Sequence, residues 1–204
     1  VDAINDGNVL PFRIDYIDTI RQKKNSGDKQ VTAIDTEEAL TSPERISEIT
    51  KHILKHFNQK TMRNSYYSLK GQRVNGFNSI FAVSSILACK KYYLELKKQL
   101  AQTHRNLTVA TIFSFVPNEE DSADGILADE SFDTDQLDQS SRDFLDMAID
   151  DYNKIFKTNY DTSSKGFQDY YKDLSEKVKK REVDLLIVVD MFLTGFDATT
   201  LNTL

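Results

Sequence analysis

A loop near the end of the chain combines residue types that suit ligand binding at the edge of a sheet. Thr194, Gly195 and Asp197 follow an apolar run, Leu185–Val189, that ends at Asp190. A continuous apolar run bounded by turn residues is typical of a strand buried on both faces, as in a parallel sheet. Functional groups in open α/β sheets gather just beyond the carboxyl ends of such strands. The sequence therefore predicts that the chemistry of this domain lies in or beside this loop.

Two residues of the loop also have ordinary structural explanations. Gly195 permits a backbone turn or a close ligand approach that a side chain would block, or it is a simple loop glycine. Asp197 can cap a helix, because Ala198–Leu201 could form the first turn of one. On the residues alone, the loop explanation is favoured for Gly195 and capping is the ordinary role of Asp197.

Serines stand at the ends of two further expected strands. Ser84 and Ser85 end the strand Ser79–Ser84 and begin a helix, and Ser114 lies near the end of the strand Thr108–Val116. Hydroxyls and unpaired N–H groups at such places suit a phosphate oxygen. Helix capping is about equally expected for the first pair. The serines are therefore candidates for contact with a phosphate backbone, Ser114 the weakest of them.

An α/β fold is expected to position these residues. Hydrophobic periodicity and turn signals predict alternating strands and helices between residues 42 and 189. They are a helix from Pro43 to about Asn58 capped by Ser42, a strand Ser79–Ser84, a helix begun by Ser85, a strand Thr108–Val116, helices Phe144–Phe156 and Phe167–Arg181, and a strand Val183–Val189. This order implies a parallel sheet with right-handed crossovers. Before it, Val9–Ile17 is expected to form a strand or an extended arm.

Composition indicates a globular protein of one large domain. The chain has 204 residues, 39% hydrophobic and 28% charged, and no apolar run approaches the length that spans a bilayer. Cys89 is the single cysteine, which fits a reducing cytoplasm. The chain opens at Val1 in a polar segment, so we expect a piece of a longer protein.

Charge is distributed unevenly. The net charge of −6 argues against a dedicated nucleic-acid binder, which is usually basic. No Lys or Arg occurs between Arg105 and Arg142, a stretch rich in carboxylates. These are Glu119, Glu120, Asp121, Asp124, Asp129, Glu130, Asp133, Asp135 and Asp138. We expect Asn118–Arg142 to be an acidic insertion. Its carboxylates would make the net charge of the whole chain negative even if another face of the domain can bind nucleic acid.

Several other patterns are expected to be structural. His52 and His56 have metal-capable spacing but lack further ligands in a recognisable pattern, so no metal site is predicted. Arg63, Lys70 and Arg73 are expected in a solvated polar loop. The chain has no G-x-x-x-x-G-K-[ST] phosphate loop, so on its own it is expected not to hydrolyse ATP.

Three blocks of the sequence resemble the motor (R) subunit of type I restriction enzymes, a member of helicase superfamily 2. Met191–Leu204, MFLTGFDATTLNTL, is similar to motif V of that family. Gly76–Tyr93, GFNSIFAVSSILACKKYY, resembles the region around motif IV. Val9–Ile20, VLPFRIDYIDTI, resembles the lead-in to the second motor domain. The blocks occur in the order found in the family.

The resemblance implies roles for the candidate residues. Gly195 and Asp197 would lie at the ATP site between two RecA-like domains, with Asp197 on the ribose or the arginines of motif VI. Ser84 and Ser85 would contact the DNA backbone, as would Thr194, although many superfamily 2 proteins carry Arg at the position of Thr194.

The resemblance also implies an organisation and partners. Residues 1–40 would be a lead-in segment and residues 41–204 a RecA-like helicase domain that stops before motif VI. The parent would use ATP and Mg²⁺ to pull double-stranded DNA and then cut it, with modification (methyltransferase) and specificity subunits as partners. Two alternatives remain open: the second motor domain of another superfamily 2 helicase or remodeller, and a non-catalytic domain that docks other subunits.

Overall fold

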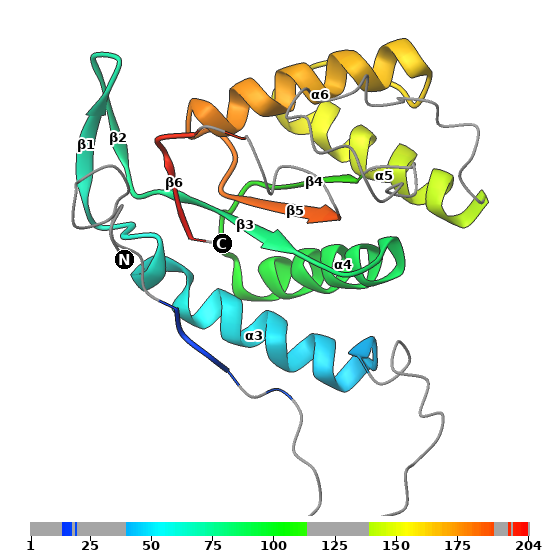
Figure 1. Cartoon of the computed structure of the whole chain (residues 1–204), viewed down its shortest axis with the longest axis horizontal. Helices are drawn as coiled ribbons and strands as arrows, with labels where there is room; N and C mark the ends of the chain where they lie inside the picture. The colour runs from blue at the N-terminus through cyan, green and yellow to red at the C-terminus, as the bar shows by residue number, and fades with distance from the viewer. Residues whose placement is uncertain are drawn as a thin grey trace, which may run out of the picture.

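A parallel sheet forms the centre of the domain (Figure 1). A computed structural model describes residues 14–17, 19, 40–113, 139–189, 196 and 198–203. Four strands of this part of the chain are all parallel. In sheet order they are β4 (Val109–Phe113), β5 (Leu185–Val189), β3 (Asn78–Ala82) and β6 (Leu201–Thr203). The predicted α/β fold with a parallel sheet is thereby confirmed.

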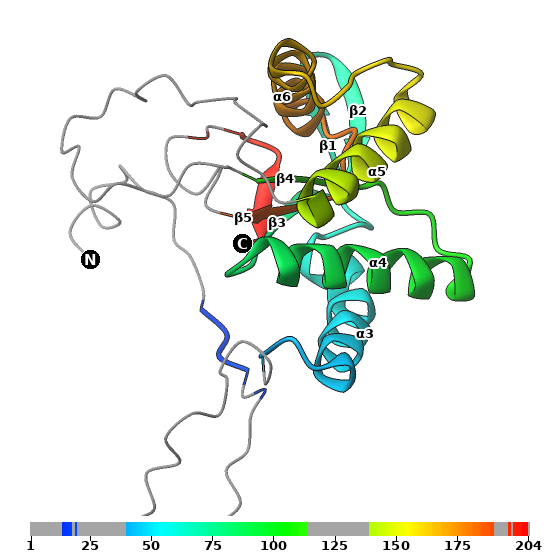
Figure 2. The same ribbon diagram turned by 90° about the vertical axis from the view of Figure 1, so that its right-hand side faces the viewer.

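Helices cover both faces of this sheet. Helix α4 (Ile86–Thr103) lies on one face, and α5 (Gln139–Phe156) and α6 (Ser164–Lys179) lie on the other. Helix α3 (Pro43–Lys60) packs on the side of α4 that faces away from the sheet, as Figure 2 shows from a second direction. The domain therefore has three layers, helix, sheet and helix, with α3 as a partial fourth.

The core lies between the sheet and the two helix layers. Every residue of β4 and β5 is buried, as expected for central strands of a parallel sheet covered on both faces. The buried stripe of α4 includes Cys89, Tyr93 and Leu96, which have the predicted helical spacing. On the opposite face Tyr170 is fully buried and donates from its hydroxyl to the carbonyl of Thr111 at 2.7 Å.

Two short elements differ from the sequence-based expectation. The segment expected to be a polar loop forms a β-hairpin, β1 (Tyr66–Leu69) and β2 (Gln72–Asn75). The helix that Ala198–Leu201 could have begun does not form: residues 198–201 form a turn in which Leu201 N–H donates to Ala198 C=O at 3.0 Å, and β6 begins at Leu201. Pairing with β3 outweighs the local helix signal there, because the strand gains a ladder neighbour.

Helix boundaries also shift. Ser42 precedes α3 with extended backbone, but its side chain makes no capping hydrogen bond, so the predicted cap is present only by position. Helix α5 begins at Gln139, within the stretch expected to be an acidic insertion. Residues 14–17 are exposed and form neither helix nor strand, and the remainder of the expected arm lies outside the described residues. No helix of the described part of the chain is long and apolar enough to cross a membrane.

Candidate functional site: the carboxyl edge of the sheet

Three strands end level at one edge of the sheet. Ala82 of β3 and Ile112 of β4 both pair with Val188 of β5, and Phe113 pairs with Val189. The segments that follow β3, β4 and β5 therefore all leave from this carboxyl edge. In open α/β sheets this is where ligands bind.

The serines after β3 occupy this edge in two different ways. Ser85 caps α4, because its hydroxyl accepts a hydrogen bond from the N–H of Ala88 at 3.2 Å. Its carbonyl accepts from Cys89 N–H at 2.9 Å. Ser84 precedes the cap and is exposed. The predicted helix start is confirmed, and Ser84 is the hydroxyl of the pair that faces solvent at the edge.

The remaining candidates fall outside the described residues. Ser114 follows the last residue of β4, and Thr194, Gly195 and Asp197 follow β5. The position of their strands is known, and their own geometry is not described. Their predicted roles therefore remain predictions.

One residue of the same loop is described. Phe196 is half-buried, packs against the core, and lies under the ammonium group of Lys179 at 5.3 Å. Lys179 is the last residue of α6, and the turn after it leads into the start of β5. Because β6 runs parallel to β3, the chain must return along the sheet between Val189 and Leu201. Phe196 lies on that return, packed against the core beside the end of α6.

The opposite, amino edge holds a polar cluster that the sequence did not predict. The Asp184 carboxylate accepts from Arg181 Nη1 at 2.5 Å and from Arg63 Nη2 at 2.9 Å, both at Oδ1. Its Oδ2 accepts from the backbone N–H of Thr108 at 2.9 Å. Arg181 donates from Nε to the carbonyl of Gly76 at 3.0 Å. The cluster joins the starts of β4 and β5 to the end of α3 and to the hairpin.

Only part of this cluster leaves a signal in the sequence. Arg181 and Asp184 are three residues apart just before a strand, which is a visible pair. Arg63 was expected in a solvated loop, yet its side chain is 17% exposed and its guanidinium lies 5.6 Å from the ring of Phe57. A partner so distant in sequence has no local pattern that could reveal it.

Metal and nucleophile chemistry finds no support in the described residues. They contain no group of three or more His, Cys, Asp or Glu placed to hold a metal ion. The rings of His52 and His56 lie 4.4 Å apart, and burial, followed by the charge of His56, lowers the pKa of His52. Burial raises the pKa of the Cys89 thiol to about 12, and Thr111 Oγ1 lies 2.9 Å from its sulfur. Cys89 is thus a core residue, as expected.

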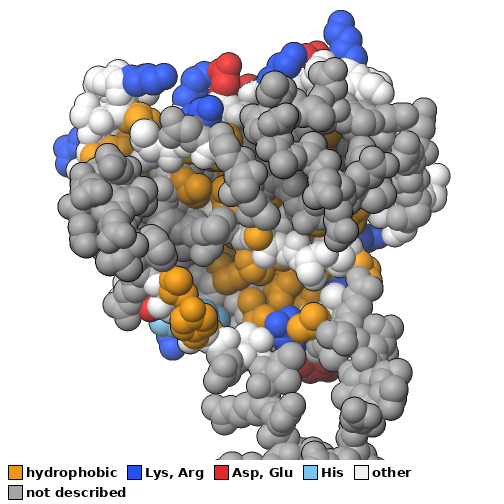
Figure 3. Space-filling view, in the orientation of Figure 1, with side chains coloured by type: hydrophobic (Ala, Val, Ile, Leu, Met, Phe, Trp, Pro, Cys, Tyr) orange, Lys and Arg blue, Asp and Glu red, His pale blue; other side chains and the backbone are white. Residues whose placement is uncertain are grey.

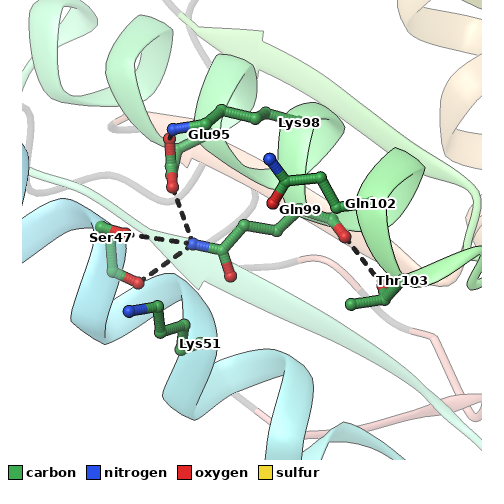
Figure 4. Close-up of a pocket in the computed structure, with 7 residues that line it drawn as sticks. All are labelled: Ser47, Lys51, Glu95, Lys98, Gln99, Gln102 and Thr103. Carbon is green, nitrogen blue, oxygen red and sulfur yellow. Dashed lines mark hydrogen bonds and ion pairs between the residues drawn. The ribbon is translucent and has the colours of Figure 1, made fainter.

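A polar groove of about 300 Å³ lies between α3 and α4, far from the carboxyl edge (Figure 4). At its centre the amide of Gln99 donates to the carbonyl of Ser47 at 3.1 Å and to Glu95 at 2.7 Å. Glu95 also pairs with Lys98 at 3.0 Å. These groups satisfy one another across the helix pair, so the groove is explained as helix packing.

The fold and its edge define a class: an α/β domain on a parallel sheet, consistent with a RecA-like arrangement, that gathers loops at one edge. Residues 75–204 match the family Type I restriction enzyme subunit R domain 3, and the chain belongs to this family.

Curated relatives agree with this family. The type I restriction enzyme endonuclease subunits of Staphylococcus aureus (strain MRSA252) and Staphylococcus saprophyticus are 42% and 40% identical over 207 residues. These matches cover all of this chain and 20% of each relative, so the chain spans about a fifth of their length. A putative type I restriction enzyme endonuclease subunit middle part of Mycoplasma pneumoniae is 34% identical over 116 residues, 55% of this chain and 89% of that protein.

Proposed function

We propose that this chain acts as the second RecA-like motor domain of an ATP-dependent DNA translocase and endonuclease subunit of a type I restriction–modification system. The observation that carries the proposal is the level carboxyl edge of β3, β4 and β5, from which both motif-bearing loops leave, in a chain of this family. Such an edge can face a first motor domain across a nucleotide.

In this proposal the loop after β5 contributes to the ATP site and the loop after β3 contacts DNA. Gly195 and Asp197, in the segment after β5, would contribute to the interdomain ATP site, where ATP and Mg²⁺ would be held mainly by the first domain. The loop after β3 presents Ser84 to the DNA backbone, and Ser114 and Thr194 would make further contacts of the same kind. Contacts of this kind fix position on DNA without reading sequence, and they weaken as salt rises.

The proposed parent works in an assembly. Its double-stranded DNA would be selected by a specificity subunit, with a modification (methyltransferase) subunit alongside, in the cytoplasm. The chain itself carries no phosphate-loop motif, so we expect turnover only when the other motor domain is present.

The decisive experiment is DNA-stimulated ATP hydrolysis by the longer endonuclease subunit carrying Asp197→Ala. We expect turnover to fall by about tenfold or more, because Asp197 would no longer position the ribose or the motif VI arginines, and misplacing groups at a catalytic site commonly costs this much. Asp150→Asn, an exposed site on α5, is the matched control and should keep normal turnover. Near-normal turnover in an Asp197→Ala protein that melts normally would remove Asp197 from the ATP site and the proposal with it.

A further inference from the structure

The β1–β2 hairpin is built with two unlike faces. Cross-strand register places Tyr66 opposite Asn75 and Ser68 opposite Arg73, so these side chains share one face, and all four are exposed. The other face carries Tyr67, Leu69 and Val74, which are half-buried. On that inner face Tyr67 stacks on Phe77, with ring centroids 4.8 Å apart. The inner face therefore accounts for the attachment of the hairpin to the domain.

The hairpin forms a two-stranded sheet of its own and stands apart from the central sheet in Figure 1. Its turn is formed by Lys70 and Gly71, which have positive φ angles of 47° and 82°. Positive φ at both central residues matches the tight hairpin turns whose twist suits antiparallel strands. A Cβ at Gly71 would meet no described atom within 4 Å, so the tip is surrounded by open space. Figure 3 shows Lys and Arg side chains over this end of the molecule, at the upper left.

The exposed face presents an oriented cation. The Arg73 guanidinium lies over the ring of Tyr66, 4.2 Å from its centroid. Stacking on an aromatic ring holds a guanidinium flat while its N–H edges remain available for a bidentate acceptor. Ser68 adds a hydroxyl directly opposite Arg73, and Asn75, an exposed residue on the same face, donates from its amide to the carbonyl of Arg63 at 3.4 Å. Neutral hydrogen-bonding groups around a fixed guanidinium match the oxygen atoms of a phosphodiester.

The charge of the surrounding chain favours the same partner. Between Ile49 and Leu94 there are eight Lys and Arg residues and no Asp or Glu, although the whole chain has a net charge of −6. The rest of the chain therefore carries the opposite sign. The pKa of Glu176 is lowered first by its hydrogen bond and ion pair with Lys180, at 2.9 Å, and to a smaller extent by the charges of Lys177 and Lys70. The eight cations of the stretch are spread over α3, the turn after it, the hairpin and α4, and Lys70 and Arg73 are the two that the hairpin carries. A positive segment on an acidic protein gives a polyanion a place to bind.

We propose that the exposed face of the β1–β2 hairpin binds the phosphate backbone of duplex DNA, with Arg73 and Lys70 neutralising phosphates and Tyr66 orienting Arg73. This inference rests on the proposed DNA translocase function and adds a second point of contact, away from the serine loop at the carboxyl edge. The domain would then contact DNA through the hairpin as well as through the carboxyl edge of the sheet.

The test is the salt dependence of duplex DNA binding by the full chain, measured by fluorescence anisotropy with a short labelled duplex. The plot of log K against log salt has a negative slope, and each lost phosphate contact reduces the magnitude of that slope by about 0.9. We expect Arg73→Ala to reduce this magnitude by about 1 and the Lys70→Ala, Arg73→Ala double variant by about 2. Lys165→Ala and Lys172→Ala, exposed sites on α6, are charge-matched controls and should keep the wild-type slope.

Conservative variants separate the role of the ring from that of the charge. Tyr66→Ala should weaken binding by roughly threefold to tenfold, because the freed Arg73 is no longer held in place. Tyr66→Phe keeps the ring and should bind like the wild type. All these residues are exposed, so circular dichroism and thermal melting should show normal folding for each variant.

The following results would overturn the inference. Wild-type slopes in both hairpin variants would do so, as would a wild-type chain that binds no duplex. A loss of subunit assembly with unchanged DNA slopes would show that the hairpin binds a protein instead. If Ser84→Ala lowers DNA affinity while the hairpin variants do not, the hairpin inference fails and the proposed function stands. If Asp197→Ala also leaves ATP turnover intact, both fail.

Discussion

The two edges of the central sheet are built for different purposes. At the amino edge, the carboxylate of Asp184 receives two guanidinium groups and a backbone N–H within 3 Å. At the carboxyl edge, the strands end in the apolar residues Ala82, Phe113 and Val189, and the next described polar side chain, Ser84, faces solvent.

At the amino edge the Asp184 carboxylate is paired within the protein, although Arg181 Nη2 and Asn78 Oδ1 are buried there without a hydrogen-bond partner among the described residues. At the carboxyl edge the hydroxyl of Ser84 is exposed to solvent. We therefore expect substitutions at the amino edge to affect stability, and we expect ligand contacts at the carboxyl edge.

The strongest way to break this comparison is to remove the charge at the amino edge. Asp184→Asn leaves the buried guanidinium of Arg181 and the largely buried one of Arg63 without a counter-charge. Breaking one side of a buried ion pair typically costs about 3 to 5 kcal/mol. Urea denaturation followed by circular dichroism should show this loss in the free energy of unfolding.

The matched control for Asp184→Asn is again Asp150→Asn, because Asp150 is exposed on α5. Its free energy of unfolding should change by no more than about 0.5 kcal/mol. Equal unfolding midpoints for the two variants would mean that the amino-edge cluster does not hold the sheet together.

A smaller effect is expected at the carboxyl edge, where two neighbouring serines can be compared. Ser85→Ala removes the hydroxyl that accepts from Ala88 N–H and should cost about 1 kcal/mol of stability. Ser84→Ala removes an exposed hydroxyl and should leave stability within about 0.5 kcal/mol of the wild type. Thermal melting measures both, and a Ser84→Ala loss as large as that of Ser85→Ala would contradict the division of roles.

The smallest effect is expected at Cys89, which lies between the two edges where α4 packs against the sheet. Burial raises the pKa of Cys89 to about 12, so its reactive thiolate is scarce in the folded protein below that pH. The rate of Cys89 alkylation in the folded chain should stay low from about pH 7 to about pH 10. In the unfolded chain the same rate should rise as the pH passes the ordinary thiol pKa of about 8.5. Rapid alkylation of the folded chain near pH 8.5 would show that the layer over the sheet opens readily.

Much of the sheet and its helices can be predicted from sequence because the signals are local. The buried run Leu185–Val189 and the helical spacing of Cys89, Tyr93 and Leu96 are visible in a single window. These features also predict Ser85 at the start of a helix. They place the carboxyl edge, and hence the general position of the candidate site, without any structure.

The features that escape prediction depend on distant partners. The hairpin strands have only four residues each, and Lys70-Gly71 is a weaker turn signal than Asn-Gly. Strand β6 has three residues and forms only because β3 lies beside it. Arg63 is largely buried and pairs with Asp184, which lies far along the sequence just before β5. In each case the deciding energy comes from a neighbour in space and not from one in sequence.

The strand order has a consequence for how this domain can be made. Strand β5 lies between β3 and β4, yet it is the last of the three in sequence. During synthesis β3 and β4 therefore emerge without a partner between them, and the sheet can close only when Leu185–Val189 has left the ribosome. Such late, long-range pairing slows folding and prolongs the exposure of apolar strand edges. A nascent chain stopped before residue 185 would be a natural client for chaperones.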